Sequence, residues 1–167
     1  MKYSEIQEAV ERVNRLLRER DYRIRTTAEQ LLDALRGAEF GFPSHEVCLQ
    51  PIDHPLDDCI SFHPIQLPSD DESGGRGFRI RFQKNHGGYL SRVFCVVSWS
   101  FTIDDEKMTA QIKGESRFHQ SALKSPVTNE FITSLANDTV AFIAKMISRI
   151  PNDDSNGKEM GFHSLQE

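Results

Sequence analysis

Alternation of apolar and polar side chains is the feature that most constrains how this chain can fold. It runs through residues 77–84, 89–103 and 108–118, and a period of two is typical of strands with one buried face. Only short polar turns separate these segments. Short turns join antiparallel neighbours, whereas parallel strands need long crossovers. The sequence therefore predicts an antiparallel β-meander with one face open to solvent.

Residues 38–75, which precede this meander, are the least regular part of the chain. Five prolines interrupt the segment, and each disfavours both a helix and a central strand. Two short extended pieces fit between them, at about 46–50 and 59–67. With these pieces the sheet would have about four to five strands.

Helical periodicity precedes the sheet. Residues 4–19 and 27–36 each carry apolar side chains at steps of three and four, which is typical of a helix with one buried face. Thr27 and Gln30 have the spacing of a capping box at the start of the second helix. The sequence therefore predicts two N-terminal helices, joined by a turn or a short extended link at 21–25.

Helical periodicity also follows the sheet, after a linker expected at 119–126. A wide apolar stripe covers residues 127–150, and its width predicts a long helix packed across the sheet. The fold class expected from all these segments is α+β: two N-terminal helices, an antiparallel meander and a long C-terminal helix.

Length and composition favour a single domain. A chain of 167 residues is the usual size for one core, which we assign to residues 1–150, with 151–167 as a mobile polar tail. No apolar run has the length of a membrane span or the form of a signal peptide. Three cysteines, an odd number, argue against a disulfide scaffold. We expect a soluble cytoplasmic protein without a membrane partner.

Charge is unevenly distributed along the chain, whose net charge is −5. Residues 38–75 contain eight acidic side chains and no Lys or Arg, whereas residues 76–150 contain eleven basic and six acidic ones. Segments of opposite sign can neutralise each other within one fold, or present two surfaces of opposite potential. The second alternative favours a protein partner or a homo-oligomer.

Arginine is the residue type that would carry such contacts, because its guanidinium group bonds carboxylates in a bidentate manner. The candidate partner-binding residues lie in the first helix and on the outward side of the first clean strand: Arg12, Arg15, Arg18, Arg79 and Arg81. A nucleic-acid partner is disfavoured, because the net charge is negative and acidic side chains interleave with the helical arginines.

Small-molecule binding is the alternative function. A long helix laid over a curved sheet can enclose an apolar cavity. The candidate cavity residues are Trp99, Phe101, Gly114, Ser116 and Phe142. The glycine and the serine are expected on the inward face of the last strand, where they leave room for a ligand or for close approach of the helix.

A metal site is the second alternative. His45, Cys48, Cys59 and His63 have pairwise spacings compatible with tetrahedral zinc. We favour the competing interpretation, in which the cysteines are small buried apolar groups and the histidines are solvated. We therefore expect no cofactor, and an enzyme only if these four side chains converge.

No catalytic motif is recognisable in this sequence. The function that we expect is a non-catalytic protein-interaction module with charge-segregated surfaces. Small adaptors, inhibitors, immunity-type partners and chaperones are the kinds of protein that fit this description.

Overall fold

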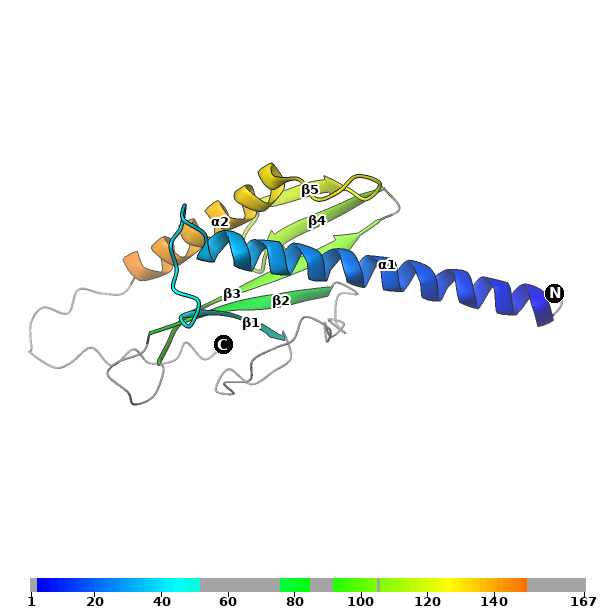
Figure 1. Ribbon diagram of the computed structural model, residues 1–167, viewed down its shortest axis with the longest axis horizontal. Helices are drawn as coiled ribbons and strands as arrows, with labels where there is room; N and C mark the ends of the chain where they lie inside the picture. Colours follow the sequence, from blue (N-terminus) through cyan, green and yellow to red (C-terminus); the bar gives the residue numbers. More distant parts are fainter. Residues whose placement is uncertain (1–2, 52–75, 85–91, 105, 150–167) are drawn as a thin grey trace, which may run out of the picture.

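The computed structural model of the chain describes residues 3–51, 76–84, 92–104 and 106–149 (Figure 1). These residues form two helices and five strands. In chain order they are α1 Tyr3–Arg36, β1 Val47–Pro51, β2 Arg76–Lys84, β3 Arg92–Ile103, β4 Lys107–Ile112, β5 Phe118–Ala122 and α2 Asn129–Ser148. The α+β class predicted from the sequence is confirmed.

The five strands form one antiparallel sheet in chain order, β1-β2-β3-β4-β5. The predicted meander is therefore confirmed, and the extended piece expected at 46–50 is the edge strand β1. On the buried face Phe78 lies opposite Trp99, which lies opposite Ile112. These three side chains are at most 4% exposed, as the alternation in the sequence requires.

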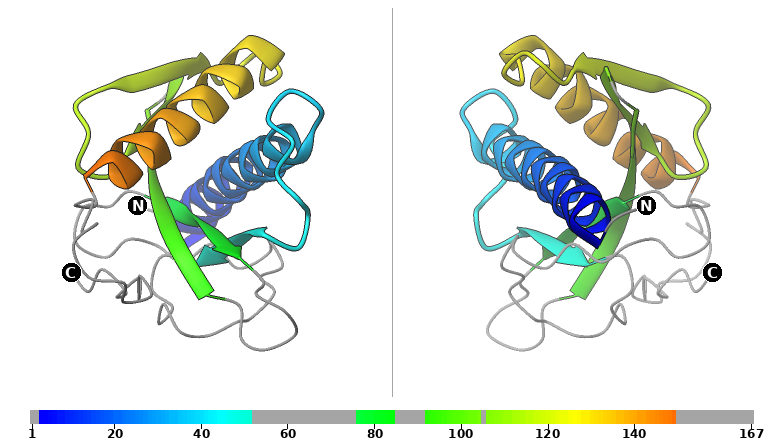
Figure 2. Two further views of the ribbon diagram at one scale, coloured as in Figure 1. Left: turned by 90° about the vertical axis from the view of Figure 1, so that its left-hand side faces the viewer. Right: turned by 90° about the vertical axis from the view of Figure 1, so that its right-hand side faces the viewer.

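Both helices cover the same face of the sheet (Figure 2). α1 contacts β1, β2 and α2, whereas α2 contacts β3 and β5. The Trp99 Nε1–H group on β3 donates a hydrogen bond to Thr139 Oγ1 on α2, at 3.1 Å. The two helices and the buried face of the sheet thus enclose one hydrophobic core.

The start of α2 is set by Thr128. This residue has an extended backbone, and its Oγ1 accepts a hydrogen bond from the backbone N–H of Phe131, at 3.2 Å. Such a cap satisfies one of the free donors of a helix start. The helix ends at Ser148, so the prediction of a long helix at 127–150 is confirmed to within two residues at each end.

The N-terminal helix is the largest departure from the prediction. Two helices were expected, but α1 is continuous from Tyr3 to Arg36. The expected link at 21–25 contains no glycine or proline, so nothing in it ends a helix. Thr27 does not act as a cap, because its Oγ1 donates to the backbone oxygen of Arg23, at 2.9 Å. The expectation of two N-terminal helices was wrong.

The strand expected at 108–118 is in fact two strands joined by a turn. β4 ends at Ile112, and Gly114 has a φ of 88°, which favours glycine. The backbone N–H of Glu115 donates to the oxygen of Ile112 at 3.0 Å and closes the turn. β5 then pairs with β4, in place of the expected linker at 119–126.

The turn between β3 and β4 lies where the sequence predicts it. Asp104 Oδ1 accepts hydrogen bonds from the backbone N–H groups of Glu106, at 2.9 Å, and Lys107, at 2.6 Å. These two donors, that of Glu106 first, lower the pKa of the Asp104 carboxyl group. A turn aspartate here acts on the backbone, as is usual for this residue type.

Two expectations fall outside the described residues: the extended piece at 59–67 and the polar tail at 151–167. Within the described ranges, neither helix has the length and apolar character that crossing a bilayer requires.

Candidate functional site

The N-terminal half of α1 extends beyond the sheet and α2 (Figure 1). Ile24 is the first residue of α1 that is fully buried, at 1% exposed. From there to Leu35 the apolar side chains of α1 enter the core. Residues 3–19, which we call the projecting half of α1, contain no buried side chain.

An apolar stripe faces solvent along the projecting half. It consists of Tyr3, Ile6, Val10, Val13 and Leu17, whose exposed fractions lie between 40% and 75%. Their spacing alternates between three and four residues, so they lie on one side of the helix. A contiguous exposed apolar surface of this kind commonly marks an interaction site.

The apolar stripe continues the face that α1 buries in its own core. Leu17, Ile24 and Leu31 follow one another at intervals of seven residues. Leu17 is 40% exposed, whereas Ile24 and Leu31 are at most 1% exposed. One helix face therefore has two environments: the sheet and α2 cover its C-terminal part, and no described residue covers its N-terminal part.

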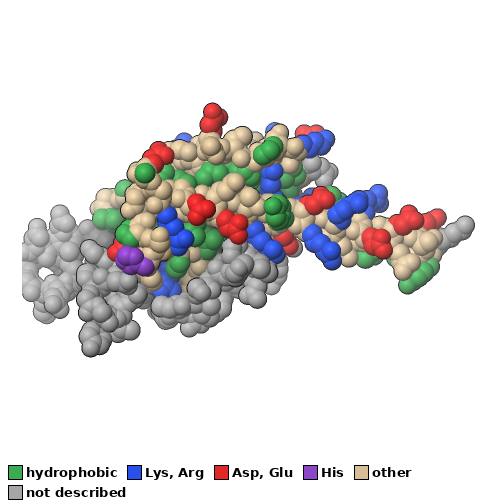
Figure 3. All heavy atoms as spheres, viewed as in Figure 1, with side chains coloured by type: hydrophobic (Ala, Val, Ile, Leu, Met, Phe, Trp, Pro, Cys, Tyr) green, Lys and Arg blue, Asp and Glu red, His purple; other side chains and the backbone are tan. Residues whose placement is uncertain are grey.

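Charged side chains of the projecting half are sorted along the helix axis, and they lie exposed on its surface (Figure 3). Three glutamates come first and three arginines follow: Glu5, Glu8, Glu11, Arg12, Arg15 and Arg18. Glu8 and Arg12 are four residues apart, as are Glu11 and Arg15. Pairs in this order support a helix that lacks tertiary contacts. The three arginines are among those predicted to contact a partner.

The other two predicted partner contacts lie elsewhere. Arg79 and Arg81 on β2 are on the sheet face opposite the helices, because they alternate with the buried Phe78 and Ile80. Arg79 is half-buried, and Arg81 is 2% exposed. The Nη2 group of Arg81 donates to Gln83 Oε1 at 2.7 Å. The five arginines therefore do not form a single surface.

Two of the four predicted zinc ligands are described. His45 is exposed before β1, with its Nε2 atom 3.9 Å from Glu46 Oε1. Cys48 is half-buried on β1. Cys59 and His63 lie outside the described residues. Within the described ranges, no three His, Cys, Asp or Glu side chains are grouped closely enough to hold a metal ion.

The five predicted cavity residues are in different environments. Trp99 and Phe101 are buried in the core, at 0% and 1% exposed. Gly114 and Ser116 are exposed in the turn between β4 and β5, so their expected place on an inward strand face was wrong. Phe142 is half-buried on α2 and borders a surface pocket.

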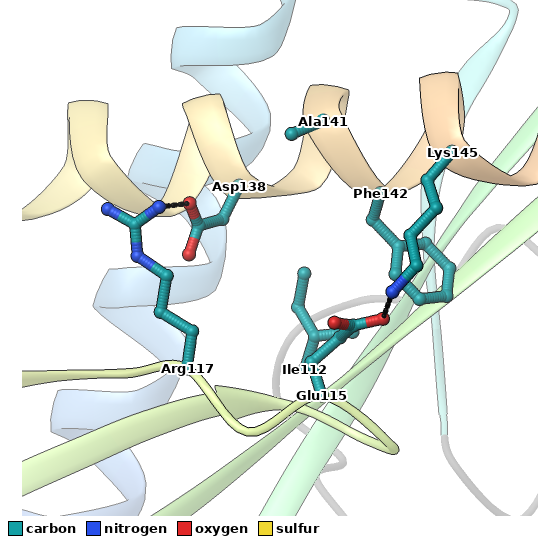
Figure 4. A pocket seen from close by; sticks show the side chains of 7 residues that line it. All are labelled: Ile112, Glu115, Arg117, Asp138, Ala141, Phe142 and Lys145. Carbon is teal, nitrogen blue, oxygen red and sulfur yellow. Dashed lines mark hydrogen bonds and ion pairs between the residues drawn. The ribbon is translucent and has the colours of Figure 1, made fainter.

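This surface pocket lies between α2 and the turn that joins β4 to β5 (Figure 4). Its volume is about 170 Å³, and it is lined by Ile112, Glu115, Arg117, Asp138, Ala141, Phe142 and Lys145. Its charges are paired with each other: Arg117 Nη1 is 3.1 Å from Asp138 Oδ1, and Lys145 Nζ is 2.5 Å from Glu115 Oε1. Ligand pockets usually exceed roughly 300 Å³, so this pocket is small for that purpose.

A histidine beside this pocket has a partner that the sequence did not predict. His119 Nε2 on β5 lies 2.6 Å from Asp138 Oδ2 on α2, and both side chains are largely buried. The two residues are 19 positions apart and on different elements, so no spacing rule connects them. Arg117 contacts the same carboxylate, so the cluster joins β5 and the turn before it to α2.

Comparison with known proteins adds no assignment. No protein-family model, curated protein or solved structure matches this chain. The function is therefore inferred from the geometry of the described residues. Among them, the exposed apolar stripe on α1 is the feature that packing within the fold explains least.

Proposed function

We propose that this chain is a non-catalytic protein-interaction module, and that it binds its partner through the apolar stripe on the projecting half of α1. The observation that carries the proposal is the exposure of that stripe, which lies on the same side of the helix as the buried face. A helix that presents apolar residues at steps of three and four is a common recognition element for grooves and for other helices.

The stripe has no role in the fold of the described residues. Val10 and Val13 are each 53% exposed, so they stabilise the domain little. Exposed apolar surface of this extent lowers solubility. Pairing with another protein would bury the stripe and remove that cost.

A protein partner fits the stripe better than a lipid surface does. Helices that bind membrane surfaces carry basic side chains on their polar face. The projecting half has four acidic side chains and three basic ones, so anionic lipid would not attract it. The arginines would then attract carboxylates of the partner. We assign the module to the cytoplasm, because an odd number of cysteines argues against a secreted disulfide scaffold.

The two alternatives have less support. A small-molecule site would need a larger space than the pocket beside Phe142. The charged side chains of that pocket also pair with each other and not with a ligand. A zinc site would need more ligands than His45 and Cys48, which are the described members of the predicted set.

Photo-crosslinking tests the proposal directly. Val13 is replaced by the photoreactive residue benzoylphenylalanine in the full chain, and the protein is irradiated in cells that express it. A matched control carries the same replacement at Glu19, an exposed position outside the stripe. We expect the Val13 variant to form a covalent adduct with a second polypeptide, which mass spectrometry then identifies, and the Glu19 variant to form much less.

Adducts formed only within one molecule would contradict the proposal, because another segment of that same molecule would then cover the stripe. Equal yields from Val13 and Glu19 would also contradict it, because contact would then be independent of the apolar face.

A further inference from the structure

We infer that the partner of the projecting half is the same segment of a second copy of this chain, paired antiparallel with it. This inference rests on the proposed function and adds the identity of the partner. It follows from a symmetry in residues 5–18, which is centred between Glu11 and Arg12.

The apolar residues of this segment are arranged symmetrically about its centre. In an antiparallel pair with that centre, Val10 of one copy lies beside Val13 of the other, and Ile6 lies beside Leu17. The alternating steps of three and four place all four residues on the seam of a two-helix coiled coil. Each of these four residues therefore meets an apolar residue, although the two copies run in opposite directions.

The charges of the segment are arranged with opposite signs about the same centre. In the antiparallel pair, each glutamate of one copy lies at the level of an arginine of the other: Glu5 with Arg18, Glu8 with Arg15, and Glu11 with Arg12. A parallel pair would instead align glutamates with glutamates and arginines with arginines. These side chains lie away from the seam, so they act through long-range attraction and not through direct ion pairs.

The positions next to the seam carry no charge. Ala9 and Leu16 adjoin it on one side, and Gln7 and Asn14 adjoin it on the other. In coiled coils these flanking positions commonly hold charged residues that select the partner. Their neutrality allows close approach, and Leu16, which is 47% exposed, widens the apolar contact.

The length of the projecting half fits an antiparallel pair. At a rise of about 1.5 Å per residue, the segment is roughly 26 Å long. A partner helix that covers it fully would reach the level of Arg20, just before Ile24 enters the core of the first copy. The two sheet domains then stand at opposite ends of the helix pair.

Sedimentation equilibrium of the full chain is the first test, and we expect a reversible dimer with a dissociation constant in the micromolar range. Val13→Gln should weaken the dimer at least tenfold, because it places an amide in the seam. The matched control is Glu19→Gln, which introduces the same residue outside the seam and opposite Ser4. It should leave the dimer unchanged. Circular dichroism at low concentration checks that both variants fold.

Disulfide trapping tests the orientation. The three native cysteines are first replaced, as Cys48→Ala, Cys59→Ala and Cys95→Ala. An Ile6→Cys chain with an affinity tag is then mixed with an untagged Leu17→Cys chain under mild oxidation. An antiparallel pair should give mainly the mixed disulfide. If the main product is instead a disulfide between two tagged chains, each joined through position 6, the pair is parallel and the inference is overturned.

Self-pairing and the interaction function can be contradicted separately. A chain that remains monomeric at high micromolar concentration overturns the self-pairing. If the Val13 photo-adduct is then a different polypeptide, the proposed interaction function stands without it. If Val13 also gives no adduct to a second polypeptide, both are wrong.

Discussion

At the scale of single residues, Trp99 shows how a polar atom is accommodated in the core. This side chain is fully buried, and its indole N–H donates to Thr139 Oγ1 at 3.1 Å. The Thr139 hydroxyl in turn donates to the backbone oxygen of Leu135, at 2.8 Å. A single hydroxyl thus satisfies a buried donor on β3 and is itself satisfied on α2.

We expect Thr139→Val to lower the free energy of unfolding by about 1–3 kcal/mol, because it leaves the buried indole N–H without an acceptor. The comparison is Thr139→Ser, which keeps the hydroxyl and should cost clearly less. Urea unfolding followed by tryptophan fluorescence measures both. Equal stability of the valine variant and the wild type would mean that the hydrogen bond contributes nothing.

Cys95 illustrates the effect of burial on a thiol. It is 8% exposed on β3, and burial raises the pKa of its thiol to about 11. At pH 8 the thiol of the folded chain therefore stays protonated, and only a thiolate reacts readily. We expect iodoacetamide to modify Cys95 at least tenfold more slowly in the folded chain than in urea, as measured by peptide mass spectrometry. Similar rates in both states would contradict this assignment.

At the scale of elements, α1 is one helix with two kinds of environment. Leu31 is buried against the sheet domain, whereas Leu17, on the same face two heptads earlier, is 40% exposed. The continuity of the helix is what carries the apolar face beyond the domain. A break at 21–25, as the sequence was interpreted, would have allowed the first helix to fold back onto the core.

We expect Leu31→Ala to lower the free energy of unfolding by about 2–5 kcal/mol, the usual range for a buried leucine. Leu17→Ala should change it by less than about 1 kcal/mol at low protein concentration, because alanine is a good helix former and little packing is lost. Urea unfolding of both variants provides the measurement. A cost for Leu17→Ala near that of Leu31→Ala would show that the stripe is buried in the monomer.

β5 is the element that depends most on its side-chain contacts. None of its five residues is fully buried, and it pairs with β4 only. Arg23 on α1 donates to the backbone oxygen of Ala122 at 2.7 Å, and His119 contacts Asp138 on α2. These contacts join the edge strand to both helices in place of apolar burial.

At the scale of the whole molecule, the structure combines a helix-covered sheet with a helix half that projects from it (Figure 1). Antiparallel pairing of two copies would give an elongated dimer. The opposing charges of the projecting halves then favour assembly from a distance, and salt weakens that attraction.

We expect the triple variant Glu5→Arg, Glu8→Arg, Glu11→Arg to weaken self-association roughly tenfold at low ionic strength, since loss of the set costs about 1–2 kcal/mol. The reciprocal variant Arg12→Glu, Arg15→Glu, Arg18→Glu should behave alike. A mixture of the two should associate again, because each chain then carries one sign of charge. Sedimentation velocity measures all three samples. Failure of the mixture to recover would exclude attraction between the projecting halves.

The sequence predicted the fold more completely than the candidate site. Strict alternation located the meander, and a wide stripe located α2, because periodicity reports directly which side chains face a core. β5 was missed because the alternation continues through the turn at Gly114. The His119–Asp138 contact was missed because it joins residues from separate elements.

The sequence by itself determined the apolar face of α1, the sorting of its charges and the period of its strands, because all three are properties of neighbouring positions. Tertiary structure alone decided which part of that face is buried. The sheet and α2 cover α1 from Ile24 onward and do not reach Val13, although both residues lie on the same side of one helix. Burial depends on what lies opposite a side chain in space, and local periodicity carries no information about that.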